Sequence, residues 1–227
     1  IPVEPALAEQ CDDRLLVDYA QTLVAGNWLG DYGWLTLAKR PGYAFLLALP
    51  SLTGFSYQAL FIGLHALACL AFVLAVRRLW DSDLVSLLVY LAMLYLPALF
   101  TWELFQRVYR MGIVIPFVVL LFSCYIAMYL RRDESIGRLV PWSVIAGLAA
   151  PVFYLIKEDG LWVAPFVGVV LAILAGGWIR GVVRRRLGVW SAAGRLLVAL
   201  LPLCCVAAAV VAVQQVNYDR YGERTIC

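Results

Sequence analysis

The stretch Leu37-Ala38-Lys39-Arg40-Pro41-Gly42-Tyr43 marks the point where the chain changes from polar to apolar. Two adjacent cations precede a Pro-Gly pair, and long apolar runs follow it almost to the end of the chain. Cations at the entrance to an apolar segment are typical of the boundary between lipid and water. The stretch therefore predicts a membrane protein that holds an anionic group at the membrane surface.

The composition also favours a membrane protein. Of the 227 residues, 64% are hydrophobic and only 15% are charged, whereas a soluble domain is about half apolar and about a quarter charged. We therefore expect an all-α, polytopic bundle of transmembrane helices. The net charge of +3 includes no basic stripe interleaved with aromatic residues, so the sequence gives no reason to expect nucleic acid as a partner. The six cysteines have no metal-ligand spacing.

Residues 1–42 predict a loop that contains an amphipathic helix. Apolar residues recur at helical spacing from Leu15 to Val24. Asp12 or Asp13 is placed to cap the start of this helix, and Gly26-Asn27 is placed to end it. Because one face of the helix is apolar, we expect it to lie along the membrane surface.

Residues 43–216 predict the helical bundle, and residues 217–227 begin a further loop. The bundle opens with an apolar piece over 43–52 that is too short to cross a membrane. The fourth and fifth predicted spans are short and only residues 157–160 separate them, which predicts a tight helical hairpin. The six predicted spans are residues 57–76, 84–100, 111–130, 141–156, 161–178 and 196–216.

The charges predict an orientation for the bundle. The alternate connections, residues 77–83, 131–140 and 179–195, hold ten of the 18 lysines and arginines but only four of the 15 acids. Short connections rich in Lys and Arg stay in the cytoplasm. Residues 1–42 are therefore expected outside the cytoplasm. Because such a segment needs a preceding span to cross the membrane, we expect the chain to be a piece of a longer protein.

This orientation gathers four polar clusters on the outer face of the membrane. Charges at the ends of spans are costly, and they are usually paired or functional. Cations there suit a phosphate or diphosphate on a lipid, and carboxylates suit a general base or a ligand of a divalent metal. For each cluster alone, ordinary loop residues that cap helices or reach toward water remain the alternative. The clusters are Asp12-Asp13, Lys39-Arg40, Glu103 with Arg107 and Arg110, and Lys157-Glu158-Asp159.

Three motifs in these clusters resemble the membrane-embedded glycosyltransferases of the GT-C fold, above all bacterial relatives of the protein O-mannosyltransferases and aminoarabinose transferases. The motifs are LTLAKRPGYAFLLAL at 35–49, RVYRMG at 107–112 and LIKEDGLWVAP at 155–165. In that family the first extracytoplasmic loop carries the catalytic base, and the donor is a polyprenyl-phosphate sugar. The resemblance implies a multi-pass enzyme of the bacterial inner membrane that transfers a sugar on the extracytoplasmic face. The sugar and the acceptor stay open, and we expect the isolated fragment to be inactive.

The resemblance also implies roles for individual residues. Asp12 or Asp13 is the base, and both are candidate ligands for a divalent metal such as Mg²⁺ or Mn²⁺. Adjacent helical side chains diverge by about 100°, so we assign the base to Asp12 and the cap of the helix to Asp13. Lys39 and Arg40 bind the donor phosphate, with Arg110 as a helper. The expected wall of the cavity is made by Glu103, Arg107, Lys157, Glu158 and Asp159.

Two other classes of protein remain open: a transporter or flippase of lipid-linked substrates, and a non-catalytic membrane subunit. A transporter is expected to have charged residues near the bilayer midplane and paired repeats. Prolines interrupt several predicted spans, but the sequence contains neither a midplane acid nor a repeat. A non-catalytic subunit leaves the four outer clusters without a chemical purpose. The enzyme is therefore the interpretation that uses most of the unusual residues.

Overall fold

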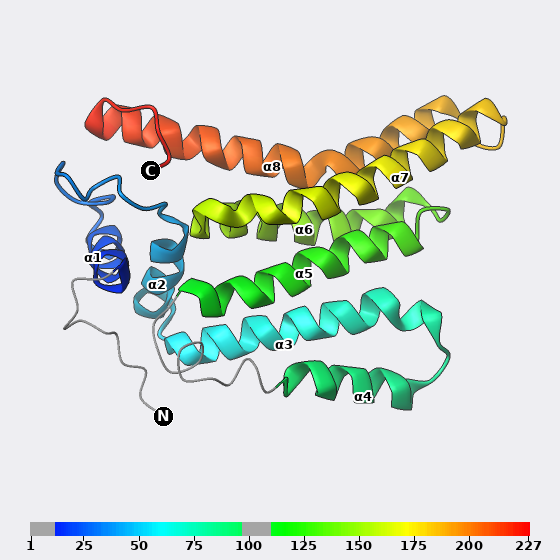
Figure 1. Ribbon diagram of the computed structural model, residues 1–227, viewed down its shortest axis with the longest axis horizontal. Coiled ribbons are helices and arrows are strands. Elements are labelled where there is room, and N and C mark those ends of the chain that lie inside the picture. The colour runs from blue at the N-terminus through cyan, green and yellow to red at the C-terminus, as the bar shows by residue number, and fades with distance from the viewer. Residues whose placement is uncertain (1–11, 97–109) are drawn as a thin grey trace.

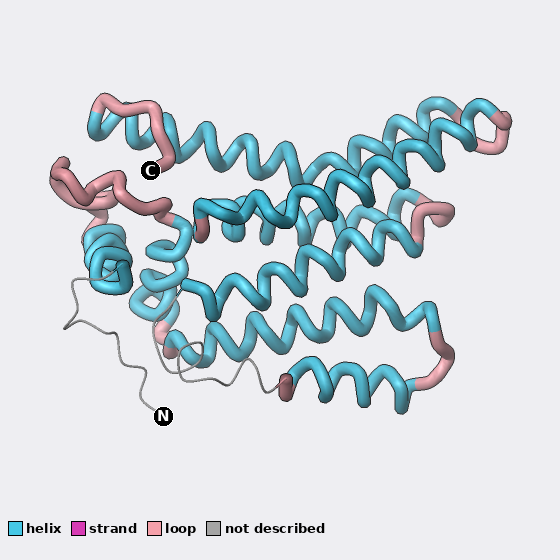
Figure 2. The backbone as a smooth tube through the Cα atoms, viewed as in Figure 1, coloured by secondary structure: helices cyan, strands magenta, loops and turns pink. Residues whose placement is uncertain are grey.

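The computed structural model describes residues 12–96 and 110–227, with the backbone alone at residues 12, 13, 158 and 159. All regular elements in these ranges are helices (Figures 1 and 2), which confirms the predicted all-α fold. Five of the described helices are long and apolar enough to cross a membrane, so the chain is a multi-pass membrane protein. They are α3 (Tyr57–Val76, continued by the 3-10 turn η1, Arg77–Leu79), α5 (Arg110–Leu130), α6 (Ile136–Ile156), α7 (Ala164–Val183, preceded by the 3-10 turn η4, Glu158–Val163) and α8 (Val189–Tyr221).

Three shorter helices complete the described fold: α1 (Asp12–Val24), α2 (Gly42–Thr53) and α4 (Asp83–Leu94). A helix of 12 residues, such as α2 or α4, is about 18 Å long and does not cross a hydrocarbon core of about 30 Å. The prediction that residues 43–52 do not span is thus confirmed. The span predicted at 84–100 is described only as the short α4, and its last four residues lie outside the described residues.

Helices α3, α5 and α7 run toward one end of the bundle and α4, α6 and α8 run toward the other, so the described connections gather at two ends (Figure 1). We call one end the basic end; it holds residues 77–82, 131–135 and 184–188. We call the other the loop end; it holds α1, the connection 25–41, η4 and the C-terminus. The three arginine-rich connections therefore lie together, as the charge pattern predicts.

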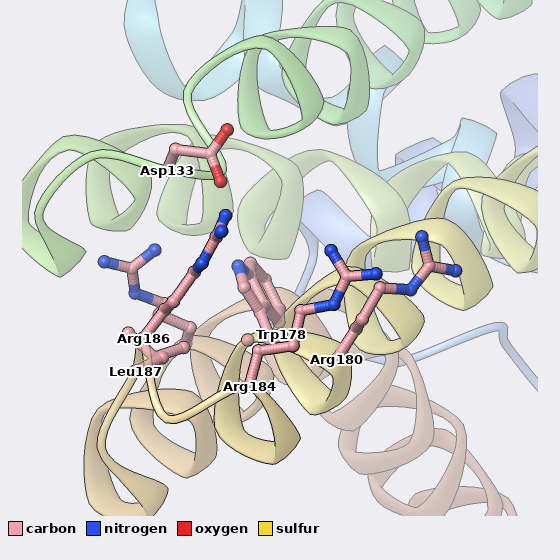
Figure 3. Close-up of a pocket in the computed structure, with 9 residues that line it drawn as sticks. Asp133, Trp178, Arg180, Arg184, Arg186 and Leu187 are labelled. Atoms are coloured by element: carbon pink, nitrogen blue, oxygen red, sulfur yellow. The ribbon is translucent and has the colours of Figure 1, made fainter.

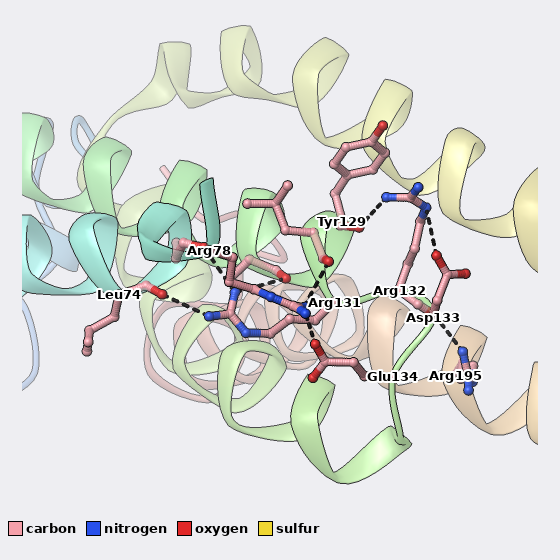
Figure 4. Close-up of polar contacts among 11 residues, drawn as sticks. Leu74, Arg78, Tyr129, Arg131, Arg132, Asp133, Glu134 and Arg195 are labelled. Atoms are coloured by element: carbon pink, nitrogen blue, oxygen red, sulfur yellow. Dashed lines mark hydrogen bonds and ion pairs between the residues drawn. The ribbon is translucent and has the colours of Figure 1, made fainter. Parts of the chain in front are cut away.

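At the basic end, arginines bond the last carbonyls of neighbouring helices (Figure 4). Arg131 follows α5, and its Nη2 and Nη1 atoms lie 2.8 Å from the Leu74 oxygen and 3.0 Å from the Ala75 oxygen at the end of α3. Arg78 follows α3, and its Nη1 atom lies 3.1 Å from the Leu130 oxygen at the end of α5. The last four carbonyls of a helix have no partner within it. Helices α3 and α5 thus cap each other.

Helix α6 packs along α8 and α5, whereas α7 packs against α8, α5 and η4. The predicted tight hairpin of α6 and α7 is therefore wrong. Small residues are the reason: a Cβ added at Gly147 of α6 would lie 3.2 Å from the Cys205 sulfur of α8. The Ser143 hydroxyl also donates to the carbonyl of Val198. Small residues let helices approach closely in a membrane, and the pattern of apolar residues does not reveal which helix takes that place.

Helix α1 ends where the sequence predicts and begins earlier. The amide of Gly26 donates to the Leu23 carbonyl at 3.0 Å, and the amide of Asn27 donates to the Thr22 carbonyl at 2.9 Å. Gly26 has φ of 80°, which is the usual glycine-terminated helix end. Because α1 already includes Asp13, the assignment of that residue as N-cap is wrong. In Figure 1, α1 is seen nearly end-on and so runs across the long helices.

Helix α2 begins at Gly42 in direct contact with the backbone of α6. A Cβ added at Gly42 would lie 2.3 Å from the carbonyl carbon of Leu155 and 2.6 Å from the amide nitrogen of Ile156. Backbone atoms cannot rotate away as the end of a side chain can. We predict that Gly42→Ala lowers the free energy of unfolding by about 1–3 kcal/mol, the usual cost of overpacking. Thermal melting of the purified protein in detergent measures the change.

Gly168→Ala is the matched control, because the space around Gly168 of α7 is open. Replacing a helical glycine by alanine where space is available stabilises a helix by about 0.5–1 kcal/mol. The two variants are therefore expected to shift the melting temperature in opposite directions. A melting temperature for Gly42→Ala at or above that of the wild type would contradict the contact between α2 and α6.

Candidate functional site

Arg40 is the residue around which the loop end is assembled. Its side chain is only 9% exposed. Its Nη1 atom lies 2.9 Å from the Tyr154 oxygen and 3.3 Å from the Lys157 oxygen, and its guanidinium carbon lies 4.6 Å from the centre of the Tyr154 ring. The structure thus brings together two of the predicted clusters, Lys39-Arg40 and Lys157-Glu158-Asp159, at the backbone of the second.

The chemistry of a helix end explains why an arginine lies here. The two carbonyls that Arg40 binds belong to the C-terminal end of α6, where carbonyls lack partners and carry partial negative charge. A guanidinium offers five N–H donors and a flat face that stacks on an aromatic ring. Arg40 therefore stabilises the end of α6. Its role as a phosphate ligand stays a prediction, and its buried Nε atom has no hydrogen-bond partner within the described structure.

The other predicted residues of the Arg40 neighbourhood lie at the same end of the bundle. Lys39 and Lys157 are both half-buried. The backbone of Glu158 and Asp159 forms the start of η4, and their side chains lie outside the described residues. Two elements that are far apart in sequence therefore supply the cations of the loop end.

The predicted acids Asp12 and Asp13 belong to α1, which lies at the loop end. The backbone of Asp12 and Asp13 forms the first turn of α1, and their side chains lie outside the described residues. Tyr19 of α1 donates its hydroxyl to the carbonyl of Leu35, in the segment that leads to Lys39. Burial raises the pKa of Tyr19 to about 12, so the hydroxyl stays protonated and keeps this bond near neutral pH. Helix α1 is therefore fixed to the connection that carries the cations.

An apolar pocket of about 490 Å³ opens at the loop end between α2, α3 and α5. Ile113 and Phe117 of α5 line it, and Arg110 precedes them at the i, i+3 and i+7 spacing of one helix face. The face of α5 that lines the pocket therefore begins with a cation. The other lining residues are Leu46, Leu49, Phe55, Tyr57, Ala59, Leu60, Phe61, Gly63, Leu64 and Leu67. The remaining members of this predicted cluster, Glu103 and Arg107, lie outside the described residues.

Sequence reasoning missed this pocket. Its lining comes from uniformly apolar helices, in which no residue type distinguishes a hollow face from a packed one. The nearest signal is a pair of tyrosines: Tyr43, which is fully buried, has its hydroxyl 2.8 Å from that of Tyr57. Tyr57 also lines a second pocket of about 350 Å³ between α1 and α2. Tyr57 thus lies between the two pockets.

The loop end is also bonded to α8. The Trp28 indole N–H donates to the Asn217 side-chain oxygen at 2.7 Å, and the Asn217 amide donates to the Thr225 carbonyl at 2.7 Å. The Tyr221 hydroxyl donates to the Gly30 carbonyl at 2.8 Å. Asn217 is fully buried. The connection 25–41 is therefore held at both α6 and α8.

A metal stays a prediction at this site. In the part of the chain that the structure describes, no three His, Cys, Asp or Glu side chains are grouped as metal ligands. The side chains of Asp12 and Asp13 are outside that part.

Comparison with known proteins does not add a relative: no family model matches the chain, and neither does a curated protein or a solved structure.

We predict that Arg40→Gln lowers the free energy of unfolding by about 1.5–3 kcal/mol, the usual contribution of hydrogen bonds from a charged group. Arg40→Lys should recover part of the loss, because an ammonium replaces the charge but not the planar donor pair. Lys39→Gln, which removes the neighbouring charge, is the control. Melting temperatures of the purified variants measure the effect. If Arg40→Gln melts at the wild-type temperature, Arg40 does not hold the end of α6.

Proposed function

We propose that the chain is the donor-binding part of a membrane glycosyltransferase that takes its sugar from a polyprenyl phosphate. The observation that carries this proposal is the apolar pocket whose α5 face begins with Arg110. A polyprenyl phosphate needs an apolar groove for its chain and a cation for its phosphate. The volume of about 490 Å³ falls in the usual range of small-molecule sites, about 300–1,000 Å³.

The surroundings of the pocket support a donor that is anchored in the membrane. The pocket lies between α2 and two membrane-spanning helices, α3 and α5, so a lipid can enter it from the bilayer. The loop that Arg40 holds brings Lys39 to the same end of the bundle. These features together suit a phosphate at the membrane boundary.

The proposed reaction assigns a step to each part of the site. Asp12 or Asp13 takes the proton of the acceptor hydroxyl, whose oxygen then bonds to the anomeric carbon of the sugar. The bond between that carbon and the donor phosphate oxygen breaks, and the phosphate leaves with the electron pair. Arg110 and Lys39 stabilise the negative charge of the departing phosphate. Arg40 keeps Lys39 in place through the end of α6.

Sugar transfer in proteoliposomes tests this function, with the full-length protein and a labelled polyprenyl-phosphate sugar. We predict that one of the variants Asp12→Asn and Asp13→Asn abolishes transfer without changing donor binding, because it removes the basicity of the carboxylate and keeps its shape. Arg110→Gln should weaken donor binding by at least about tenfold, the loss of one charge-assisted bond. Arg14→Gln is the control, because Arg14 lies on α1 with a side chain that is 59% exposed. Undiminished transfer by Asp12→Asn, Asp13→Asn and Arg110→Gln alike would rule out this site.

The function requires the loop end to face outward, and two tryptophans allow a matched test. Trp34 at the loop end and Trp190 at the basic end are each 91% exposed. In a background with Cys11→Ser and Cys227→Ser, we predict that Trp34→Cys reacts with an impermeant thiol reagent in intact cells and that Trp190→Cys reacts only after lysis. The basis is the retention of arginine-rich connections in the cytoplasm. The reverse pattern would place the donor pocket on the wrong face.

A further inference from the structure

A further pocket, which we call the cationic pocket, lies at the basic end, far from the proposed donor site. It has a volume of about 360 Å³ and is bounded by the α7–α8 connection and the 131–135 connection. Figure 3 shows Arg180 and Arg184 extending in the same direction from α7, with Asp133 across the pocket. Asp133 is the only acid among the lining residues, and the arginines that line the pocket are Arg180, Arg184, Arg186 and Arg195.

The turn after α7 is built so that alternate arginines line this pocket. The amide of Arg186 donates to the Gly181 carbonyl, and the amide of Arg185 donates to the Val182 carbonyl, each at 2.9 Å. Arg185 itself has φ of 56°, a left-handed conformation that this position usually reserves for glycine. Arg185 does not line the pocket, whereas its neighbours Arg184 and Arg186 do.

The charges of this pocket are not balanced by the protein. Among the described residues, Arg180, Arg184 and Arg186 form no ion pair, and the one acid, Asp133, lies 3.7 Å from Arg132. Arg195 is 9% exposed, and its Nε atom is buried without a hydrogen-bond partner in the described structure.

Other arginines of the basic end differ: Arg77 pairs with Asp83, and Arg78 pairs with Glu134. Retention of basic connections in the cytoplasm explains arginines at this end. Retention in the cytoplasm does not explain why four of these arginines line a pocket that has only one acid among its lining residues. Gathered cations are stabilised by an anion.

An apolar groove adjoins the cationic pocket. The groove has a volume of about 280 Å³ and is lined by apolar side chains that include Ile179, Val183 and Val189, which are 61%, 76% and 65% exposed. Trp178 lines both the groove and the cationic pocket, and its indole N–H donates to the Arg132 carbonyl at 3.0 Å. A ligand that fills both must combine an anionic head with a hydrocarbon chain.

We propose that the basic end binds an anionic phospholipid, with its phosphate among Arg180, Arg184 and Arg186 and one acyl chain in the groove beside Trp178. Basic pockets between membrane helices on the cytoplasmic side are known to take such headgroups. The site lies at the opposite end of the bundle from the donor pocket and does not depend on the proposed transferase activity.

Lipid binding to the purified protein in neutral detergent tests the proposal, by native mass spectrometry and by thermal melting. Phosphatidylglycerol is expected to bind and raise the melting temperature, phosphatidylcholine to do neither, and inorganic phosphate to bind far more weakly. The double variant Arg180→Gln/Arg184→Gln should weaken phosphatidylglycerol binding by at least about tenfold. Equal protection by inorganic phosphate, or no preference for phosphatidylglycerol over phosphatidylcholine, would overturn the proposal.

Two further variants separate a built site from general attraction. Arg77→Gln/Arg138→Gln removes the same charge from the same end but outside the pocket, and it should bind phosphatidylglycerol like the wild type. Ala193→Trp fills the groove and keeps every arginine, so it should weaken phosphatidylglycerol and leave the weak binding of inorganic phosphate unchanged. If the two double variants lose phosphatidylglycerol binding equally, the lipid is attracted by the surface charge of the basic end and not bound at a defined site. If Ala193→Trp binds phosphatidylglycerol like the wild type, no acyl chain occupies the groove.

Discussion

The constraint on which this structure depends is the set of carbonyl groups at the C-terminal ends of its spanning helices. Within a helix these groups have no partner. Arginine supplies the partner at three described ends: Arg131 at α3, Arg78 at α5 and Arg40 at α6. Because each arginine belongs to a different segment from the helix it caps, every cap also joins two parts of the chain.

This constraint accounts for where the arginines lie. Helices α3, α5 and α7 end at the basic end, where most of the arginines are, and α6 ends at the loop end, where Arg40 is. Arg40, a cation of the loop end, thus has a structural partner in the carbonyls of Tyr154 and Lys157, and its neighbour Lys39 remains the cation proposed for the donor. The basic end holds more arginines than its helix ends use, and the excess surrounds the pocket beside Trp178.

The sequence predicts what hydropathy and charge control, namely the helical class, the spans at α3, α5 and α8, and the grouping of the basic connections. It does not predict packing that depends on small residues, so the place of α6 beside α8 rather than α7 was missed. The sequence predicts Arg40 as a phosphate ligand, but it does not predict the bonds of Arg40 to the carbonyls of Tyr154 and Lys157. Every residue has a backbone carbonyl, so no residue type marks these two as partners. The apolar pocket between α2, α3 and α5 was missed because apolar side chains look alike on packed and hollow faces.

The sequence separation between the bonded residues of the loop end also sets the order in which parts of the protein can assemble during synthesis. Arg40 meets Tyr154 across 114 residues, and Trp28 meets Asn217 across 189. At about 5–20 residues per second, a ribosome needs roughly 6–23 s to make the partner of Arg40 after Arg40 itself. During that time the Arg40 guanidinium lacks the α6 carbonyls that it binds, whereas the Arg78 bond to α5 closes after only 52 residues. The contact between α3 and α5 at the basic end can thus form before Arg40 and Trp28 fix the loop end.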